Sequence, residues 1–415
     1  KPFFPLTIGK GGTIRSFTMD CVKMRTESPT YTEMNGCQKV LTPMIARLNN
    51  ITYSLIVLID VNLKIVPNDS EVVIETTIPN VILGKFPIVV GSSYCTLKNN
   101  IRDECKNEIG GYFIINGNEK VVIAQEKSIP NMIHVHKPSG ASGKYRYVSE
   151  VRSCVEGSYG YTKLISVKLT DKGDNSTLYG TIPHIKQDVP LLIIFKALGC
   201  LSDKDCLHYI IENDGSILDR RLQSALKRSL LEVSGIRTQQ EAMEYLTSRI
   251  YSGYSTGRNQ GMTDDSKFKY CQYILENEYL PHCGNSQKCK LYFLGLMVKS
   301  LLKTGLGYQT VSDRDSYQNK RVEGVGCLLG SLTFQCLHRM GKDIKGSLTK
   351  EIVSGAWSLN GDVRDILTKH NIEKIFRSNY MEGILKGSLS TGNWGLKHTQ
   401  NRQGVSQVLN RMTTM

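Results

Sequence analysis

Gly110-Gly-Tyr-Phe-Ile-Ile-Asn-Gly-Asn-Glu-Lys-Val-Val-Ile-Ala-Gln-Glu-Lys127 is the stretch that decides the fold of the first part of this chain. Two short runs rich in β-branched residues, 113–115 and 121–124, flank Asn116-Gly-Asn-Glu. Asn and Gly tolerate the positive φ angles that a tight turn demands. The stretch therefore predicts a β-hairpin that turns at Asn116 and Gly117.

Short β-branched runs on both sides of this hairpin predict further strands. Before it, residues 52–60, 71–75 and 84–91 alternate with turn signals, and after it residues 145–182 have the same character. Within the latter, residues 161–169 alternate apolar and polar side chains. The first half of the chain is therefore expected to be rich in β-structure.

Helical spacing replaces this alternation from about Leu191 onward. Within 219–231, the side chains expected on one helix face are Leu222, Ala225, Leu226, Ser229 and Leu230. A Gly-, Ser- and Asn-rich stretch at 252–265 predicts a loop or domain boundary. Further helices are expected at 268–280, 291–303 and 322–340, so the predicted fold class is α+β.

The composition is that of a folded, basic, multidomain protein. The chain has 415 residues, a formal net charge of +14, 40% hydrophobic residues and 22% charged residues, and a length typical of roughly three domains. The positive charge favours a polyanionic partner, without distinguishing nucleic acid from an anionic membrane surface. The longest apolar run near a helix, 291–298, is too short to span a bilayer.

The 12 cysteines form no C-x-x-C pair, which favours free thiols in a reducing compartment. The tightest grouping is His282-Cys283 with Cys289, and a zinc site there would need a further ligand. The chain begins at Lys1 and stops at Met415 directly after a structured-looking motif. We therefore expect a piece of a longer polypeptide.

The last 33 residues, 383–415, contain four basic residues and no Asp or Glu. We call this stretch the C-terminal arm. A cationic, glycine-hinged backbone with many hydrogen-bond donors is suited to a loop that faces nucleic acid. The alternative is an ordinary solvated surface loop.

Two further clusters have candidate metal chemistry. Asp313 and Asp315 could bind Mg²⁺ beside a phosphate, but Arg314 lies between them, so local capping and pairing are favoured. The His134-Val-His136 pair is a two-ligand fragment and is more often incidental on a strand.

Several motifs together resemble one family. The stretch 110–127 resembles the signature hairpin of the second-largest, beta-type subunit of eukaryotic and archaeal multisubunit DNA-directed RNA polymerases. Residues 313–322 resemble that family's fork motif, and 390–395 and 404–411 are similar to the segments flanking its second fork loop. Weaker matches are 147–152, 195–199 and 280–282, and all occur in the family's order.

The resemblance implies a multidomain α+β architecture corresponding to the N-terminal half of such a subunit. It assigns a β-rich protrusion to 1–128, an inserted mixed α/β lobe to 129–265, a second, helical protrusion part to 266–311, and a largely helical, truncated fork to 312–415.

By the same resemblance, the chain helps to form the cleft for DNA and the RNA–DNA hybrid beside the active centre of a nucleotidyltransferase. The implied partners are the largest subunit, other polymerase subunits, the DNA template and the hybrid, with no membrane. Mg²⁺ would be held mainly by the largest subunit, and this chain alone is expected to hold no metal and no catalytic residue. The implied location is the nucleus, or the cytoplasm or virion for a large DNA virus.

Seven residues are the candidates for nucleic-acid binding. The basic ones would attract phosphates and the amides would donate to sugar or phosphate oxygens; they are Lys320, Arg321, Lys397, Arg402, Gln407, Asn410 and Arg411. Trp394 is interpreted as a buried anchor for the loop in preference to a stacking platform for a base.

Two other function classes stay open at this point. One is a stand-alone nucleic-acid-binding scaffold without polymerase activity, and the other is an independent phosphoryl-transfer enzyme using Asp313 and Asp315. The neighbouring reading frame would distinguish the first, and metal titration the second.

Overall fold

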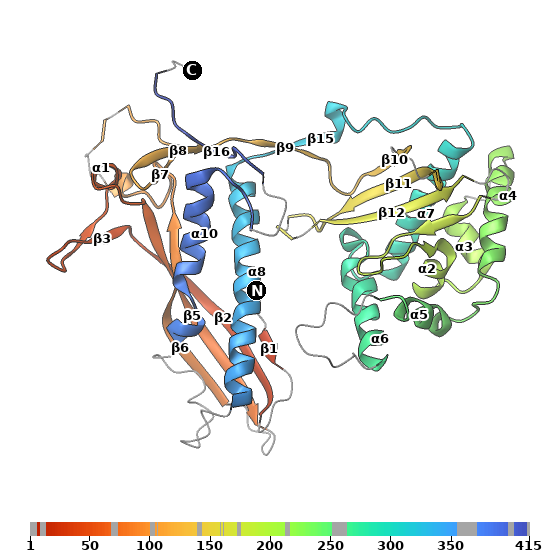
Figure 1. Cartoon of the computed structure of the whole chain (residues 1–415), viewed down its shortest axis with the longest axis horizontal. Helices are drawn as coiled ribbons and strands as arrows, with labels where there is room; N and C mark the ends of the chain where they lie inside the picture. Colours follow the sequence, from red (N-terminus) through yellow and green to blue (C-terminus); the bar gives the residue numbers. More distant parts are fainter. Residues whose placement is uncertain are drawn as a thin grey trace. The chain divides into compact units, whose positions relative to one another are not determined.

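The structure, a computed structural model, describes residues 6–8, 14–67, 74–99, 104–105, 107–138, 143–157, 159–160, 162–171, 176–211, 216–250, 264–354, 372–396 and 402–412. The chain forms two compact units (Figure 1), of which the first comprises 1–125 with 322–415 and the second comprises 126–321. Both mix helices with strands, which confirms the α+β class.

The first unit is built from two separate parts of the sequence. Its N-terminal elements are β1 (Leu6–Ile8), β2 (Ile14–Glu27), β3 (Thr30–Thr32), β4 (Gln38–Val40), α1 (Pro43–Leu48), β5 (Ser54–Pro67), β6 (Ile74–Pro87), the 3₁₀ turn η1 (Thr96–Asn99), β7 (Phe113–Ile115) and β8 (Asn118–Val122). Its C-terminal elements are α8 (Val325–Ser354), α9 (Ile372–Ile375), α10 (Ser378–Thr391) and β16 (Ser406–Val408).

A four-stranded antiparallel sheet of order β1-β2-β5-β6 is the centre of this unit. Every second side chain of β5 is buried, from Leu55 to Ile65, as a half-buried strand requires. The strand predicted at 52–60 is thus confirmed and extends to Pro67.

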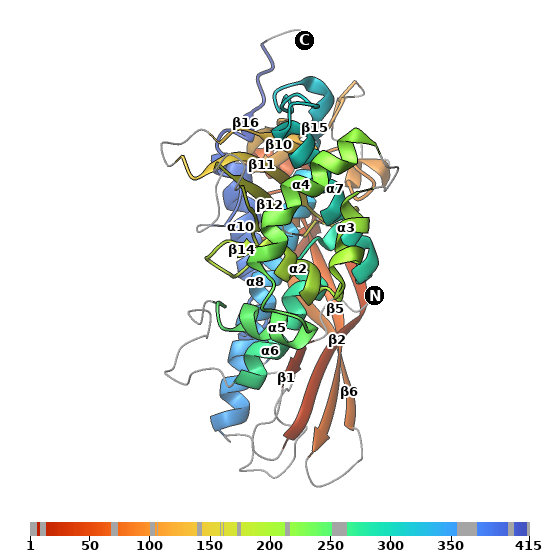
Figure 2. The same cartoon turned by 90° about the vertical axis from the view of Figure 1, so that its right-hand side faces the viewer.

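Helices α8 and α10 lie along this sheet (Figures 1 and 2). A buried side chain recurs every fourth residue along α8, giving the stripe Leu328, Leu332, Cys336, Met340, Ile344 and Leu348. The helix expected over 322–340 is therefore confirmed and continues to Ser354. Its predicted start at Val322 was wrong, because β15 (Lys320–Glu323) occupies that position.

Gly84 lets α10 approach β6 closely. A Cβ at Gly84 would lie 3.0 Å from the Ser378 carbonyl oxygen and 3.1 Å from the Met381 Cβ. The φ of Gly84 is +155°, which side chains rarely adopt. The C-terminal helices are consequently fixed directly on the N-terminal sheet.

The second unit is continuous in sequence. Its elements are β10 (Ile133–His136), β11 (Tyr145–Ser153), β12 (Lys163–Thr170), β13 (Leu178–Gly180), β14 (Val189–Pro190), α2 (Leu191–Ala197), α3 (Asp203–Ile210), α4 (Ile217–Glu232), α5 (Gln239–Thr247), α6 (Asp264–Tyr273), the π turn η4 (Ile274–Glu278), the 3₁₀ turn η5 (Pro281–Cys283), α7 (Gln287–Gly305) and the 3₁₀ turn η6 (Tyr317–Asn319). The strands form one antiparallel sheet in the order β10 to β14. The chain crosses between the units in β9 (Gln125–Ser128) and β15, which pair with each other.

Helices α6 and α7 belong to the core of the second unit. The resemblance assigned residues 266–311 to a second protrusion part, but α7 buries Leu294, Met297, Val298 and Leu301 in the core of the second unit. The Gly-rich stretch at 252–265 therefore interrupts this unit without ending it. The residues predicted to share one face of 219–231 do pack on that core, within α4.

Among the described helices, none combines the length and the apolar character needed to cross a membrane.

Candidate nucleic-acid interface

The C-terminal arm joins the hairpin of residues 110–127 as a third strand. β16 pairs antiparallel with β8, with Ser406 opposite Val122 and Val408 opposite Lys120. The hairpin itself turns at Asn116 and Gly117, whose φ angles are 49° and 80°. The predicted turn is thus confirmed, and two motifs distant in sequence form one sheet of order β16-β8-β7.

The arm doubles back between Trp394 and Arg402. The Trp394 N–H donates to the Arg402 carbonyl oxygen over 2.7 Å, and the reverse hydrogen bond measures 3.2 Å. Gly392, with a φ of 77°, is needed here because a Cβ would lie 2.6 Å from the Ser406 carbonyl oxygen. This antiparallel bridge holds Trp394 and Arg402 opposite each other.

Trp394 is a buried anchor. Its side chain is 6% exposed, and its indole N–H donates to the Leu328 carbonyl oxygen over 3.1 Å in the first turn of α8. A buried indole cannot stack on a nucleic-acid base, so the anchor interpretation is the correct one.

Arg402 faces a carboxylate from a distant part of the first unit. Its Nη1 lies 2.7 Å from Glu323 Oε2, while 44% of the Arg402 side chain stays exposed. The pair therefore orients the guanidinium without burying it.

Arg411 is held by two glutamates and an aromatic ring. Its Nε lies 2.7 Å from Glu119 Oε2 and its Nη2 lies 3.6 Å from Glu108 Oε1. The guanidinium carbon also lies 5.3 Å from the ring centre of Tyr112, a cation–π distance. These contacts tie the end of the arm to the hairpin and the loop before it.

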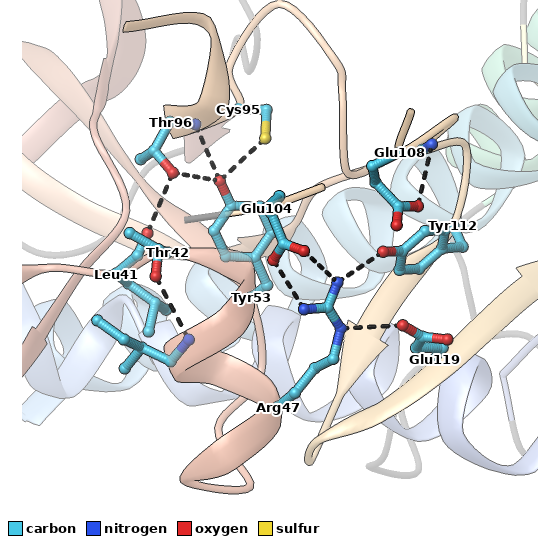
Figure 3. A network of polar contacts seen from close by, with 12 residues as sticks. Leu41, Thr42, Arg47, Tyr53, Cys95, Thr96, Glu104, Glu108, Tyr112 and Glu119 are labelled. Atoms are coloured by element: carbon cyan, nitrogen blue, oxygen red, sulfur yellow. Dashed lines mark hydrogen bonds and ion pairs between the residues drawn. The ribbon is translucent and has the colours of Figure 1, made fainter. Parts of the chain in front are cut away.

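Glu119 connects Arg411 to a second arginine, Arg47. Arg47 Nε lies 2.9 Å from Glu119 Oε1, and its Nη1 lies 2.7 Å from Glu104 Oε1 (Figure 3). Arg47 also donates to the Tyr112 hydroxyl over 2.8 Å. Hydrogen bonds from Arg411, together with the nearby positive charges, hold the pKa of Glu119 below its usual range.

The two amide candidates make local hydrogen bonds and remain exposed. The Gln407 amide donates to the Gly404 carbonyl oxygen over 3.4 Å. The Asn410 side-chain oxygen accepts from the Met412 N–H over 2.9 Å, which forms a turn at the end of the arm.

Lys320 and Arg321 belong to the second unit. Both lie in strand β15, directly before the helix that was expected to begin at 322. Lys320 Nζ lies 3.1 Å from Glu126 Oε1, and the Arg321 guanidinium donates to two nearby carbonyl oxygens. Lys397 lies outside the described residues.

Comparisons with known proteins show which family the sequence matches. The family described as "RNA polymerase beta subunit" matches residues 6–374. The chain is 36% identical over 404 residues to "DNA-directed RNA polymerase II subunit 2" of Arabidopsis thaliana, covering 93% of this chain and 32% of the relative. It is 33% identical to the subunit RPB2 of Schizosaccharomyces pombe, covering 98% of this chain and 34% of the relative.

An archaeal relative is covered more fully. "DNA-directed RNA polymerase subunit Rpo2N" of Methanocaldococcus jannaschii is 30% identical over 401 residues, covering 94% of this chain and 72% of the relative. The chain belongs to the RNA polymerase beta-subunit family. It spans about a third of the length of the two eukaryotic relatives.

The paired aspartates of 313–315 make a local contact with each other. The Asp315 N–H donates to Asp313 Oδ1 over 2.9 Å, so Asp313 supports a local turn. Among the described residues, no group of three or more His, Cys, Asp or Glu side chains is arranged to hold a metal ion.

Sequence reasoning missed the acidic partners of the arm in this member of the beta-subunit family. The arm has no carboxylate of its own, but Glu108, Glu119 and Glu323 supply carboxylates to its arginines. Glu119 lies inside the predicted hairpin, close to the Asn116-Gly117 turn. This position was the sequence signal that could have identified it as a partner of the arm.

Proposed function

We propose that this chain is the N-terminal part of the second-largest subunit of a DNA-directed RNA polymerase. In the assembled enzyme it would help to form the cleft for DNA and the RNA–DNA hybrid, and it would not carry out catalysis alone. The match of the family to residues 6–374 is the observation that carries this proposal. The reported relatives are all polymerase subunits, which favours this role over a stand-alone scaffold.

The partners follow from the same proposal. The chain would assemble with the largest subunit, which would hold most of the Mg²⁺ coordination, and with further polymerase subunits around the DNA template. A nuclear location is proposed because the family includes subunits named for eukaryotic RNA polymerase II. The cytoplasm or virion would apply to a viral enzyme.

The C-terminal arm is the proposed nucleic-acid contact within the first unit. Arg402 and Arg411 are 44% and 52% exposed, so each can meet a phosphate while its carboxylate partner fixes its direction. Gln407 and Asn410 would add hydrogen bonds to sugar or phosphate oxygens. Lys397, from the same arm, would contribute a third positive charge.

Lys320 and Arg321 are separate candidates for phosphate contact, because they belong to the second unit. Both residues lie in strand β15. Alanine substitutions at these two residues would therefore test a phosphate contact that is separate from the C-terminal arm.

The domain names are part of the proposal. The first unit would contain the protrusion and the fork, and the second would correspond to the lobe. The packing of α6 and α7 in the second core supports a lobe that continues through residue 321.

Salt dependence of hybrid binding tests the electrostatic part. If about four phosphates are neutralised, the log–log slope of affinity against salt for an RNA–DNA hybrid is about −3 to −4. Arg402→Ala combined with Lys397→Ala should make the slope less steep by nearly one for each charge removed.

A matched control removes two positive charges elsewhere in the first unit. Lys39 and Lys64 each contact a glutamate at 2.7 Å and are 57% and 43% exposed, close to the exposure of Arg402. Their double alanine variant should keep the wild-type slope. Equal slopes for both double variants, or a wild-type slope near zero, would reject the arm as the contact.

A further inference from the structure

Two buried thiols in the second unit meet where α2 ends and α3 begins. Cys206 Sγ lies 3.1 Å from Cys200 Sγ. The side chains of Cys200 and Cys206 are 5% and 0% exposed, and both are free cysteines. Neither residue takes part in the proposed nucleic-acid contact, so that contact does not explain why the two thiols lie together.

The backbone fixes Cys200 in this position. The Gly199 N–H donates to the Lys196 carbonyl oxygen and the Cys200 N–H donates to the Phe195 carbonyl oxygen, each over 3.0 Å. With Gly199 at a φ of 96°, these two bonds form the Schellman motif that ends many helices. The chain therefore reverses at Gly199, and Cys200 is directed toward α3.

Cys206 is fixed by the first turn of α3. Its N–H donates to the Ser202 carbonyl oxygen over 3.0 Å, and its thiol also lies 3.6 Å from the Cys200 carbonyl oxygen. Two rigid helix ends thus hold the sulfurs in contact. Because a disulfide bond is about 2.05 Å long, the sulfurs need to approach by only about 1 Å.

The two thiols differ in reactivity. The hydrogen bond from Cys206 lowers the pKa of Cys200, whereas the same contact and burial raise the pKa of Cys206. Burial and the carboxylates of Asp205 and Asp203 act against this lowering of the Cys200 pKa, and the ammonium of Lys196, 3.5 Å from Asp203 Oδ1, acts with it. The lowered pKa makes Cys200 the attacking sulfur of the pair, because the thiolate is the nucleophile.

We propose that Cys200 and Cys206 form an oxidisable dithiol site that closes to an intramolecular disulfide when a small peroxide reaches it. The Cys200 thiolate attacks one oxygen of hydrogen peroxide, which gives Cys200 sulfenic acid and hydroxide. Cys206 then loses its proton and attacks the Cys200 sulfur, and the sulfenic oxygen leaves as water. In total, two thiols and one peroxide give one disulfide and two waters.

The closed form links the end of α2 to the start of α3. Ile193, Ile194 and Phe195 of α2 are buried in the core of the second unit. The disulfide would therefore attach α3 covalently to the end of α2, a helix whose residues are all buried. A thiol reductant reverses the step, because a disulfide exchanges with thiolates.

Peptide mapping of the full chain tests the proposal. The chain is exposed to hydrogen peroxide, its remaining thiols are alkylated under denaturing conditions, and it is then digested with trypsin. Cleavage after Lys204 separates the two cysteines, so the disulfide links peptide 197–204 to peptide 205–220. We expect this linked pair to appear, to lack two hydrogens, and to disappear after reduction.

Variants test the order of the steps. In Cys206→Ser, Cys200 should stop at sulfenic acid and react with a sulfenic-acid probe, whereas in Cys200→Ser the buried Cys206 should stay reduced. Cys271→Ser, which removes a different buried thiol with 2% exposure, should leave the linked pair unchanged.

The wild-type chain alone can overturn the inference, so the result does not depend on whether a variant folds. The exposed cysteines Cys37, Cys105, Cys289 and Cys327 serve as the internal measure of oxidation. If they are oxidised while Cys200 and Cys206 both remain alkylated as thiols, the dithiol site is rejected. A linkage of Cys200 to any other cysteine would reject it equally.

Discussion

Each unit contains a charged side chain with several hydrogen-bond partners, and the two differ in burial and in the sequence distance to those partners. In the first, Arg411 reaches Glu119 across 292 positions of sequence, and the pair stays near the surface. In the second, Lys290 is 1% exposed and donates to the carbonyl oxygens of Leu275 and Glu276, only 15 and 14 positions away. The first contact joins distant segments of a discontinuous unit at the surface, whereas the second is a local contact in the core of a continuous unit.

The largest expected effect is on the stability of the first unit, through its hydrophobic core. Trp394→Ala removes a buried indole and its hydrogen bond to Leu328, and should destabilise the first unit by about 3–5 kcal/mol. Urea unfolding followed by backbone circular dichroism measures this. Trp394→Phe keeps an aromatic ring and should destabilise the first unit less. The two units have separate hydrophobic cores, so an equal loss of stability in the second unit on Trp394→Ala would contradict this prediction.

The buried lysine gives the next largest effect. Lys290→Ala leaves two buried carbonyl oxygens without their donor and should cost about 1–3 kcal/mol, measured by urea unfolding. Lys299→Ala, on the same helix α7, is the comparison for a less buried lysine.

The same lysine predicts a pH dependence. Burial lowers the pKa of Lys290, so between that value and the ordinary lysine pKa of about 10.4 the unfolded state binds more protons. Stability should therefore rise with pH across this window in the wild type. Lys290→Met should lack this rise, and an unchanged pH profile would contradict the assignment.

A smaller effect is expected for the surface network. Glu119→Gln weakens the ties to Arg47 and Arg411 and should cost about 1 kcal/mol at neutral pH. Because the pKa of Glu119 is lowered on folding, its contribution is present above the ordinary glutamate pKa of about 4.3 and is lost as the pH falls through the lowered value. Acid titration of the variant should be flatter than that of the wild type.

The smallest stability effect is expected at Arg402. Arg402→Ala removes an exposed ion pair and should change the free energy of unfolding by less than about 1 kcal/mol. Glu323→Gln should have a similarly small effect on stability but should leave the charge of Arg402 free for phosphate. Hybrid affinity that falls in the first variant and does not fall in the second would separate phosphate contact from structural support.

Local signals in the sequence predicted the elements well. The Asn116-Gly117 turn, the β-branched content of β5 and the helical spacing along α8 each act over a few positions of sequence. The order of the motifs pointed to the beta-type subunit family, and the family match over residues 6–374 confirmed membership of that family.

Partners across long stretches of chain could not be predicted in this way. Nothing in the spacing of the arm indicated that Glu119 and Glu323 would face its arginines. The Gly-rich stretch at 252–265 was interpreted as a boundary because composition marks a loop but does not say which core the next helix joins.

Photo-cross-linking of an RNA–DNA hybrid to the full chain tests the central claim, that the C-terminal arm lies against nucleic acid. The hybrid carries a photoreactive base, and the adducts are located by peptide mapping at low and high salt. The account predicts adducts within residues 396–411 that decline as salt rises. Adducts that avoid this stretch altogether, at any salt concentration, would contradict it.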